Sequence, residues 1–244
     1  MRNITFYCIL FILFISCKKE NRCDCLKSTG KIVIENRVVG DFTNIWIEDN
    51  INVIIKPDTV NKIAIEAGKN LLELIHTEIK NNYLYITNEN RCNWVRKFDI
   101  PINAYISIKK LDSINYWGYG NITCTDTLKN DIFQIDVHDG AGTIDLTIKA
   151  QESRLKIHTG PPTMNIKGIS RVNLLYQGGT GIINAEDLIT EYTYLKSFGT
   201  NDCYIHVTKE LEAKINYIGN VYYKGNPYSI KTEYTDKGKL IKLD

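Results

Sequence analysis

The sequence predicts an all-β protein whose body is a solenoid of stacked coils, each about 20 residues long. Three observations lead to this prediction. Glycines recur at nearly constant spacing in the second half of the chain, apolar residues at positions i and i+2 accompany them, and no segment after Cys17 has the pattern of a long helix. Repeats of this kind indicate units that bury their apolar sides only by stacking on one another.

The regularly spaced glycines begin after Asp112 and recur about every 20 residues. They are Gly118, Gly140, Gly160, Gly179, Gly199 and Gly219. An apolar pair precedes nearly every one of them, as in Ile135/Val137 and Leu174/Tyr176, and in most cases a second pair follows. Such alternation is typical of strands with one buried side. We therefore expect three short strands and three turns per coil, with a β-sandwich or a propeller as alternatives.

The first half of the body also alternates, as in Ile45/Ile47 and Val53/Ile55. The segment from Leu71 to Ile79 is ambiguous, because its apolar residues fit either a helical face or one arm of a hairpin that turns at Asn81-Asn82. The many neighbouring strands favour the hairpin.

Residues 1–16 have the features of a bacterial signal peptide: Arg2 supplies a positive start, and Ile4 to Ile15 is an apolar run too short to cross a bilayer. The run ends in Phe14-Ile15-Ser16-Cys17, which resembles a lipobox. The resemblance implies cleavage before Cys17 and lipid attachment to its thiol, whereas ordinary secretion would leave Cys17 a plain thiol. Several acyl chains would anchor the protein stably in a lipid bilayer.

We accordingly divide the chain into a signal peptide (1–16), a lipid-anchored tether (17–37) and a β-solenoid (38–244). Lys18 and Lys19 directly follow the lipid-carrying Cys17. An aspartate at this position would resemble a signal for retention in the inner membrane, and the sequence has none there. We therefore expect an outer-membrane lipoprotein on the periplasmic or the cell-surface face.

An exported chain meets an oxidising compartment in which disulfides are permitted. Cys92 lies in a polar segment, and Cys23 and Cys25 lie in the tether. We expect one disulfide from Cys92 to Cys25, with Cys23 as the alternative partner. Cys124 and Cys203 lie four coils apart, about 19 Å, which is too far for a disulfide, so we expect both to be buried free thiols.

An outward stripe is predicted along the coils, because the residues that follow the inward pairs share one column. It contains Trp117, His138, His158, Gln177 and Phe198, and then Ile218. Exposed aromatic residues in a row suit binding of a glycan or a partner surface, whereas packing beneath the loops is the structural alternative. Asp136 and Lys156 share a column of their own, which predicts a surface ion pair.

Composition and motifs argue against several functions. The 30 Lys and Arg balance 28 Asp and Glu, so the net charge of +2 gives no reason to expect nucleic acid as a partner. The sequence contains no nucleophile motif, phosphate-binding loop or HExxH motif, and we expect no cofactor. The two histidines of the stripe have no evident third ligand, so no metal site is predicted. The acidic residues are densest at Asp126, Asp136, Asp139 and Asp145, and they share no column.

Several glycine-rich segments of this sequence resemble the bacterial head GIN domain family, which is described as adhesin-like. They are Phe42-Thr43-Asn44-Ile45, Glu66 to Leu71, Tyr116-Trp117-Gly118-Tyr119-Gly120-Asn121-Ile122, Gly140-Ala141-Gly142 and the closing Gly219 to Pro227. The resemblance covers Val38 to Leu243 and implies a single-stranded, right-handed, parallel β-helix-like fold in the cell envelope, as in Bacteroidetes. Two corners, Gly160-Pro161-Pro162 and Gly199-Thr200-Asn201, depart from the Gly-x-Gly pattern.

The sequence thus predicts a lipid-anchored envelope protein that holds a glycan or a surface protein without enzymatic activity. Two alternatives remain at this point: a carbohydrate-active β-helix lyase or hydrolase, and a purely structural component of the envelope. A cleft with two carboxylates about 5–10 Å apart would favour the enzyme.

Overall fold

The computed structural model describes residues 28–90 and 101–243, and over these residues it is built of β-strands with one short 3-10 turn. Its elements are β1 (Ile32–Arg37), β2 (Asn44–Asp49), β3 (Ile51–Pro57), β4 (Lys62–Gly68), η3 (Leu72–Leu74), β5 (Ile75–Lys80), β6 (Tyr83–Asn88), β7 (Ile102–Ile108), β8 (Ser113–Gly118), β9 (Ile122–Cys124), β10 (Leu128–Val137), β11 (Thr143–Ile157), β12 (Thr163–Gln177), β13 (Ile182–Ser197), β14 (Cys203–Ile215), β15 (Val221–Lys224), β16 (Ser229–Tyr234) and β17 (Leu240–Lys242). In these described ranges no helix is long and apolar enough to span a membrane.

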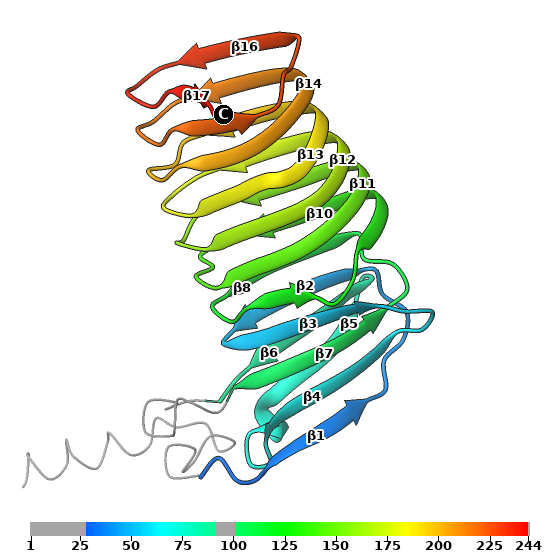
Figure 1. Cartoon of the computed structure of the whole chain (residues 1–244). Coiled ribbons are helices and arrows are strands. Elements are labelled where there is room, and N and C mark those ends of the chain that lie inside the picture. Colours follow the sequence, from blue (N-terminus) through cyan, green and yellow to red (C-terminus); the bar gives the residue numbers. More distant parts are fainter. Residues whose placement is uncertain (1–27, 91–100, 244) are drawn as a thin grey trace, which may run out of the picture.

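The strands stack along one axis, from β1 and β4 at one end to β16 and β17 at the other (Figure 1). From β10 to β14 each strand pairs in parallel with the strand one coil later. Leu128 pairs with Ile148, Ile148 with Gly168, and Gly168 with Leu188, so these coils are equal in length and match the repeat read from the sequence. The predicted all-β solenoid is confirmed.

Each regular coil consists of one long strand, bent in the middle, and one glycine-rich loop. Strands β11 and β12 each contain 15 residues, and β13 contains 16. The residues Asp131, Gln151 and Arg171 are not paired across neighbouring strands, and this interruption of the backbone ladder marks the bend. The expectation of three strands and three turns per coil is therefore wrong, because the backbone ladder continues almost without a break around the bend.

The bend divides the solenoid into two faces. Face A contains β6, β2, β8 and the parts of β10–β14 that follow the bend. Face B contains β7, β3, β9 and the parts of β10–β14 that precede it. The loops at 138–142, 158–162, 178–181, 198–202 and 216–220 lead from face A back to face B.

The first half of the molecule departs from the order of the sequence. The coil of β2 and β3 lies between β6/β7 and β8/β9, although β6 and β7 follow it in the chain. Strand β4 is antiparallel to both β1 and β7, and β5 is antiparallel to β6. The hairpin interpretation is thus correct for β5 and β6, and it turns at Asn81 and Asn82, which have positive φ angles of 51° and 65°. Strand β1 belongs to the sheet, although it lies ahead of the predicted boundary at Val38.

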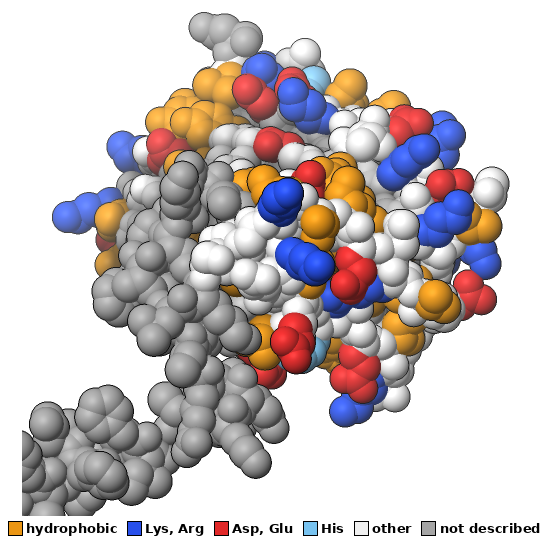
Figure 2. Space-filling model, turned by 90° about the horizontal axis from the view of Figure 1, so that it is seen from below, with side chains coloured by type: hydrophobic (Ala, Val, Ile, Leu, Met, Phe, Trp, Pro, Cys, Tyr) orange, Lys and Arg blue, Asp and Glu red, His pale blue; other side chains and the backbone are white. Residues whose placement is uncertain are grey.

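The visible surface at the β1 end mixes both signs of charge. Figure 2 looks onto this end and shows Lys and Arg interspersed with Asp and Glu, with apolar side chains between them. This distribution agrees with a net charge of only +2 for the chain.

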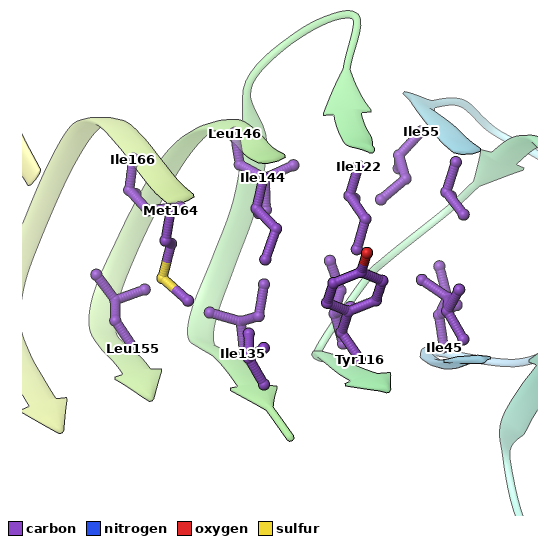
Figure 3. Packing of buried hydrophobic residues seen from close by; sticks show 14 of the residues in the cluster. Ile45, Ile55, Tyr116, Ile122, Ile135, Ile144, Leu146, Leu155, Met164 and Ile166 are labelled. Atoms are coloured by element: carbon purple, nitrogen blue, oxygen red, sulfur yellow. The ribbon is translucent and has the colours of Figure 1, made fainter. Parts of the chain in front are cut away.

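The core is a continuous column of apolar side chains between the two faces. Ile144, Met164 and Ile166 point from face B toward Ile135 and Leu155 on face A (Figure 3). Strand β3 alternates buried and half-buried residues along its first five positions, as the period of two predicts. Stacking therefore provides the buried surface that a single coil lacks.

Candidate functional site

The predicted outward stripe lies at the edge where the strands of face A enter the glycine-rich loops. Trp117 is the second-last residue of β8, and His138, His158 and Phe198 directly follow β10, β11 and β13. The backbone N–H groups of these last three residues each donate to a carbonyl one coil earlier, at 2.7–2.8 Å. The parallel ladder therefore extends one residue beyond each strand and aligns the side chains in one row.

The rings in this row stack on one another over several coils. Trp117 stacks on His138 with ring centroids 4.5 Å apart, and His138 stacks on His158 at 4.3 Å. Tyr176 follows His158 at 5.3 Å, and Phe198 follows Tyr176 at 5.8 Å. Four of the six residues predicted for the stripe, namely Trp117, His138, His158 and Phe198, are thus in one continuous stack.

The prediction that Gln177 belongs to the stripe is wrong. Its side chain is fully buried, and its Nε2 donates to the carbonyls of Gly181, Asn201 and Asp202 at 3.0–3.2 Å. The error arises because this coil contains two adjacent glycines, Gly178 and Gly179. Counting the spacing from Gly179 assigns the stripe position to Gln177, one residue before the residue that occupies it.

Gly178 occupies the stripe position of its coil, because its N–H donates to the carbonyl of Ile157 at 2.6 Å. A glycine has no side chain to stack, and the Tyr176 ring lies between His158 and Phe198 instead. Leu174 and Tyr176, predicted to point inward, are only half-buried, whereas their neighbours Leu175 and Gln177 are buried.

The stack continues beyond Trp117 in residues that the sequence reasoning missed. Trp46 of β2 stacks on Trp117 at 5.8 Å and contacts Tyr85 at 5.7 Å, and Tyr85 contacts Tyr83 at 6.1 Å. We call the whole row the aromatic ladder: Tyr83, Tyr85, Trp46, Trp117, His138, His158, Tyr176 and Phe198. The alternation of apolar residues around Trp46 was visible in the sequence. Its alignment with Trp117 was not, because β4 to β7 lie between β3 and β8 in the chain.

The geometry of the aromatic ladder limits the ligands it can bind. From Trp46 to His158 the ring planes differ by only 5–18° between neighbours, so the ring faces cover one another and the edges point outward. Sugar rings pack on open aromatic faces, and within this part of the ladder each face already has a neighbour. Trp117 is nevertheless 39% exposed and Phe198 45%, so both offer apolar edges to a partner surface.

A buried carboxylate lies beneath the two histidines. Asp136 is 6% exposed, and its Oδ1 lies 3.2 Å from Lys156 Nζ and 3.1 Å from His158 Nε2. The Gln134 side chain donates to the other oxygen, Oδ2. Burial raises the pKa of Asp136, but the hydrogen bonds from Gln134, His158 and Lys156 outweigh it, so its pKa lies below the ordinary value. The predicted ion pair between Asp136 and Lys156 is present. Its Asp136 carboxylate is buried, however, whereas a surface pair was expected.

Asp136, His138 and His158 are the residues of this region that could contact a metal ion, since their ligand atoms lie within 4.8 Å of one another. The view that the histidines have no third ligand nearby is therefore wrong. Their arrangement nevertheless does not suit coordination. Both oxygens of Asp136 already accept hydrogen bonds, and the two imidazole planes are 5° apart, so their in-plane lone pairs run parallel instead of converging.

A broad hollow of about 890 Å³ lies elsewhere, along the outside of the bend. Its carboxylates are Asp131 and Glu191, which are three coils apart, about 14 Å at the usual strand spacing. Glu191 lies 3.0 Å from Lys209 and 3.9 Å from Arg171. Glycoside hydrolysis needs two carboxyl groups about 5–10 Å apart, and this pair does not meet that requirement.

Cys203 is fully buried and free, as predicted, and burial raises its pKa. Cys124 is also free but only half-buried, which corrects the expectation for this residue. It ends the short strand β9, and its Sγ accepts a hydrogen bond from the Thr147 N–H at 3.1 Å. Cys17, Cys23, Cys25 and Cys92 lie outside the described residues, so the lipid attachment and the disulfide stay predictions.

Comparison with known proteins identifies the family. The family model described as "putative auto-transporter adhesin, head GIN domain" matches residues 41–227. The chain belongs to this family. The resemblance inferred from its glycine-rich segments is thus confirmed, and the aromatic ladder from Trp46 to Phe198 lies within the matched head GIN domain.

Several solved structures from Bacteroidetes have the same fold. A putative adhesin from Bacteroides fragilis aligns with a TM-score of 0.81 at 20% identity, over 87% of this chain and 97% of that chain. A putative adhesin from Parabacteroides merdae has a TM-score of 0.67 at 20% identity, over 89% and 98% of the two chains. A putative lipid binding protein from Parabacteroides distasonis has a TM-score of 0.69 at 16% identity, over 89% and 98%. At these identities the likeness shows the fold of the head GIN domain, and no curated protein matches the chain.

Proposed function

We propose that this head GIN domain protein is a lipid-anchored, non-enzymatic binding module of the outer membrane, with an adhesin-like role. The lipobox-like Phe14-Ile15-Ser16-Cys17 supports the anchor, and the description of the family supports the adhesin-like role. The acyl chains on Cys17 would hold the protein in the bilayer, and the tether would let the solenoid reach a glycan or a surface protein.

The observation that carries this proposal is the periodic outer surface of the solenoid. The residues paired between β10, β11 and β12 are 20 positions apart, and most of those paired between β12 and β13 keep this spacing, so side chains of one kind recur in rows along this part of the axis. Trp117 and Phe198 expose apolar edges on one such row, four coils apart. A rigid surface with repeated features suits recognition of an extended partner, because little conformational entropy is lost on binding.

Two observations weigh against a carbohydrate-active enzyme. The carboxylates of the broad hollow are about 14 Å apart, too far for the acid and base of glycoside hydrolysis. Asp136 is held by Lys156, His158 and Gln134, which keeps it ionised and inaccessible as a general acid. A purely structural role in the envelope would need no ligand at all, and the experiment below separates it from a binding role.

The proposal is tested by screening the purified full-length chain in detergent against a glycan array and for adhesion to whole cells. The expected result is saturable binding of at least one glycan or cell surface. The variant Trp117→Ser/Phe198→Ser, checked for folding by circular dichroism, reports whether the aromatic ladder takes part. Absence of binding to both the array and the cells would contradict the proposal and favour the structural role.

A further inference from the structure

The broad hollow on the outside of the bend collects positive charge. Five cationic side chains line it: Lys109, Lys110, Lys129, Lys149 and Arg171. Its acidic residues are Asp131 and Glu191, so the formal charge of the lining is +3 (five minus two). The whole chain carries only +2, so the hollow is a local concentration of positive charge on a surface that is otherwise balanced.

Two of these lysines lack a compensating carboxylate among the residues that the structure describes. Lys109 pairs with Asp41 at 3.0 Å, and Lys110 pairs with Asp112 at 2.9 Å. Lys129 and Lys149 make no ion pair with any residue in the described parts of the chain, and both are exposed.

Lys129 and Lys149 are also direct neighbours across the parallel ladder between β10 and β11. Like charges opposite each other on adjacent strands destabilise a sheet. A bound anion lying between the two ammonium groups would remove this repulsion. The pair is therefore a second, independent indication that the hollow accepts a negatively charged ligand.

The cations are arranged as a line instead of a cluster. They occur on four consecutive coils, at Lys109 and Lys110, then Lys129, Lys149 and Arg171, with a step of about 4.8 Å between coils. Ile169 and Ile189 continue the row of Lys129 and Lys149 and are 56% and 45% exposed. A ligand that fits this line is extended, carries a charge at regular intervals and has apolar surface that can lie on Ile169 and Ile189, next to its charges.

We propose that the hollow binds an acidic polysaccharide that lies along the solenoid axis, an inference that rests on the proposed binding function and names its ligand class. Carboxylates on successive sugar residues would contact the line of cations, and the apolar sides of the sugar rings would pack on Ile169 and Ile189. Anionic lipid in a bilayer fits less well, because a flat membrane surface does not reach into a hollow. Single-stranded nucleic acid fits less well, because the residues that line the hollow include no aromatic side chain on which bases could stack.

The test uses the purified full-length chain in detergent, with polygalacturonate as the probe and isothermal titration calorimetry as the measurement. We expect saturable binding that weakens as salt is raised, because ion pairs are screened. The variant Lys129→Gln/Lys149→Gln should bind about tenfold more weakly or worse, since two charge-assisted contacts are lost. The control Lys231→Gln/Lys239→Gln makes the same charge change at exposed sites of the last coil and should bind as the unmodified protein does.

Three further measurements sharpen the result. Thermal unfolding should show the Lys129→Gln/Lys149→Gln protein to be at least as stable as the original, so weaker binding would not reflect misfolding. Oligogalacturonates should gain affinity with length until they span the four coils, about 14 Å between the first and the last. Dextran, which is neutral, should not bind.

Equal binding by the Lys129→Gln/Lys149→Gln protein, or equal binding of dextran, would overturn the proposal. Tighter binding of a single-stranded DNA oligomer or of phosphatidylglycerol vesicles than of polygalacturonate would also overturn it. A positive glycan or cell screen with no affinity for polygalacturonate would reject only this ligand class, whereas a screen negative throughout would reject the binding function itself.

Discussion

At the scale of single residues, the glycine-rich loops are shaped by the side chain beneath them. Tyr116 is fully buried, and its hydroxyl donates to the carbonyl of Gly120 at 2.5 Å. Burial raises the pKa of Tyr116, so the group stays a neutral donor. A Cβ atom added at Gly142 would lie 1.8 Å from that carbonyl oxygen and 2.6 Å from the Tyr116 hydroxyl. The Gly-x-Gly pattern at this corner therefore reflects packing around Tyr116.

The substitution Gly142→Ala should lower the free energy of unfolding by about 1–3 kcal/mol, as is usual when a packed site is overfilled. Urea denaturation monitored by circular dichroism measures the change. Gly40→Ala is the control, because a Cβ there would meet its nearest atom, Ile79 Cδ1, at an ordinary 3.9 Å. Equal stability of the two variants would contradict the packing role of Gly142.

The stacked histidines should make stability depend on pH. Burial, and then the electrostatic interaction with His158, lower the pKa of His138 below 6.5, while Asp136 and Asp139 act in the opposite direction. The unfolded chain therefore takes up this proton at higher pH than the folded chain, and stability should fall as the pH drops below about 6.5. Asp136, whose pKa is lowered from 3.8, adds a separate loss at more acidic pH.

Unfolding free energies measured between pH 8 and pH 3 test this prediction. His138→Gln should remove the loss that begins near neutral pH and keep the more acidic one. The exposed His76, which lies outside the aromatic ladder, is changed to Gln as the matched control for the substitution itself. A His138→Gln profile identical to that of the original protein would show that the stacked imidazole does not couple to folding.

At the scale of elements, the aromatic ladder couples neighbouring coils. Stacked aromatic pairs contribute about 0.5–1.5 kcal/mol beyond the area they bury. A double-mutant cycle of Trp117→Ala and His138→Ala should therefore show a coupling free energy of about that size in urea denaturation. Trp117→Ala with Phe198→Ala is the matched control, because these residues are about 19 Å apart and should act additively. A coupling free energy between Trp117 and Phe198, with none between Trp117 and His138, would contradict the role of stacking.

The sequence was sufficient for the strands and for the coil length, because both follow from the periodicity of buried residues. It failed where register depends on one residue. Shifting a strand by one position exchanges all its inward and outward side chains. The Gly178-Gly179 pair permits such a shift, so the spacing predicts that Leu174 and Tyr176 point inward, whereas Leu175 and Gln177 are the buried residues. The position of β6 and β7 beneath β2 and β3 was also hidden, since alternation is the same for parallel and antiparallel neighbours.

At the scale of the whole molecule, the two candidate binding surfaces are rows of side chains that only the stacked coils bring together. The stripe of rings was partly predictable, because Trp117, His138, His158 and Phe198 recur at close to one coil length or twice that spacing. The basic hollow was not recognised, although Lys129 and Lys149 are also one coil length apart. Its other cations come from the connection before β8 and from the bend of β12, whose positions along the surface become clear only in the folded chain.

The central claim is that this protein holds an extended partner and leaves it chemically unchanged. The most direct measurement is the mass distribution of a glycan that the full-length chain captures, recorded before and after prolonged incubation with an excess of the protein. We expect reversible binding and an unchanged distribution, because the carboxylates of the hollow are too far apart to act as a catalytic pair. Shortened chains or new unsaturated ends that appear only in the presence of the protein would contradict the claim.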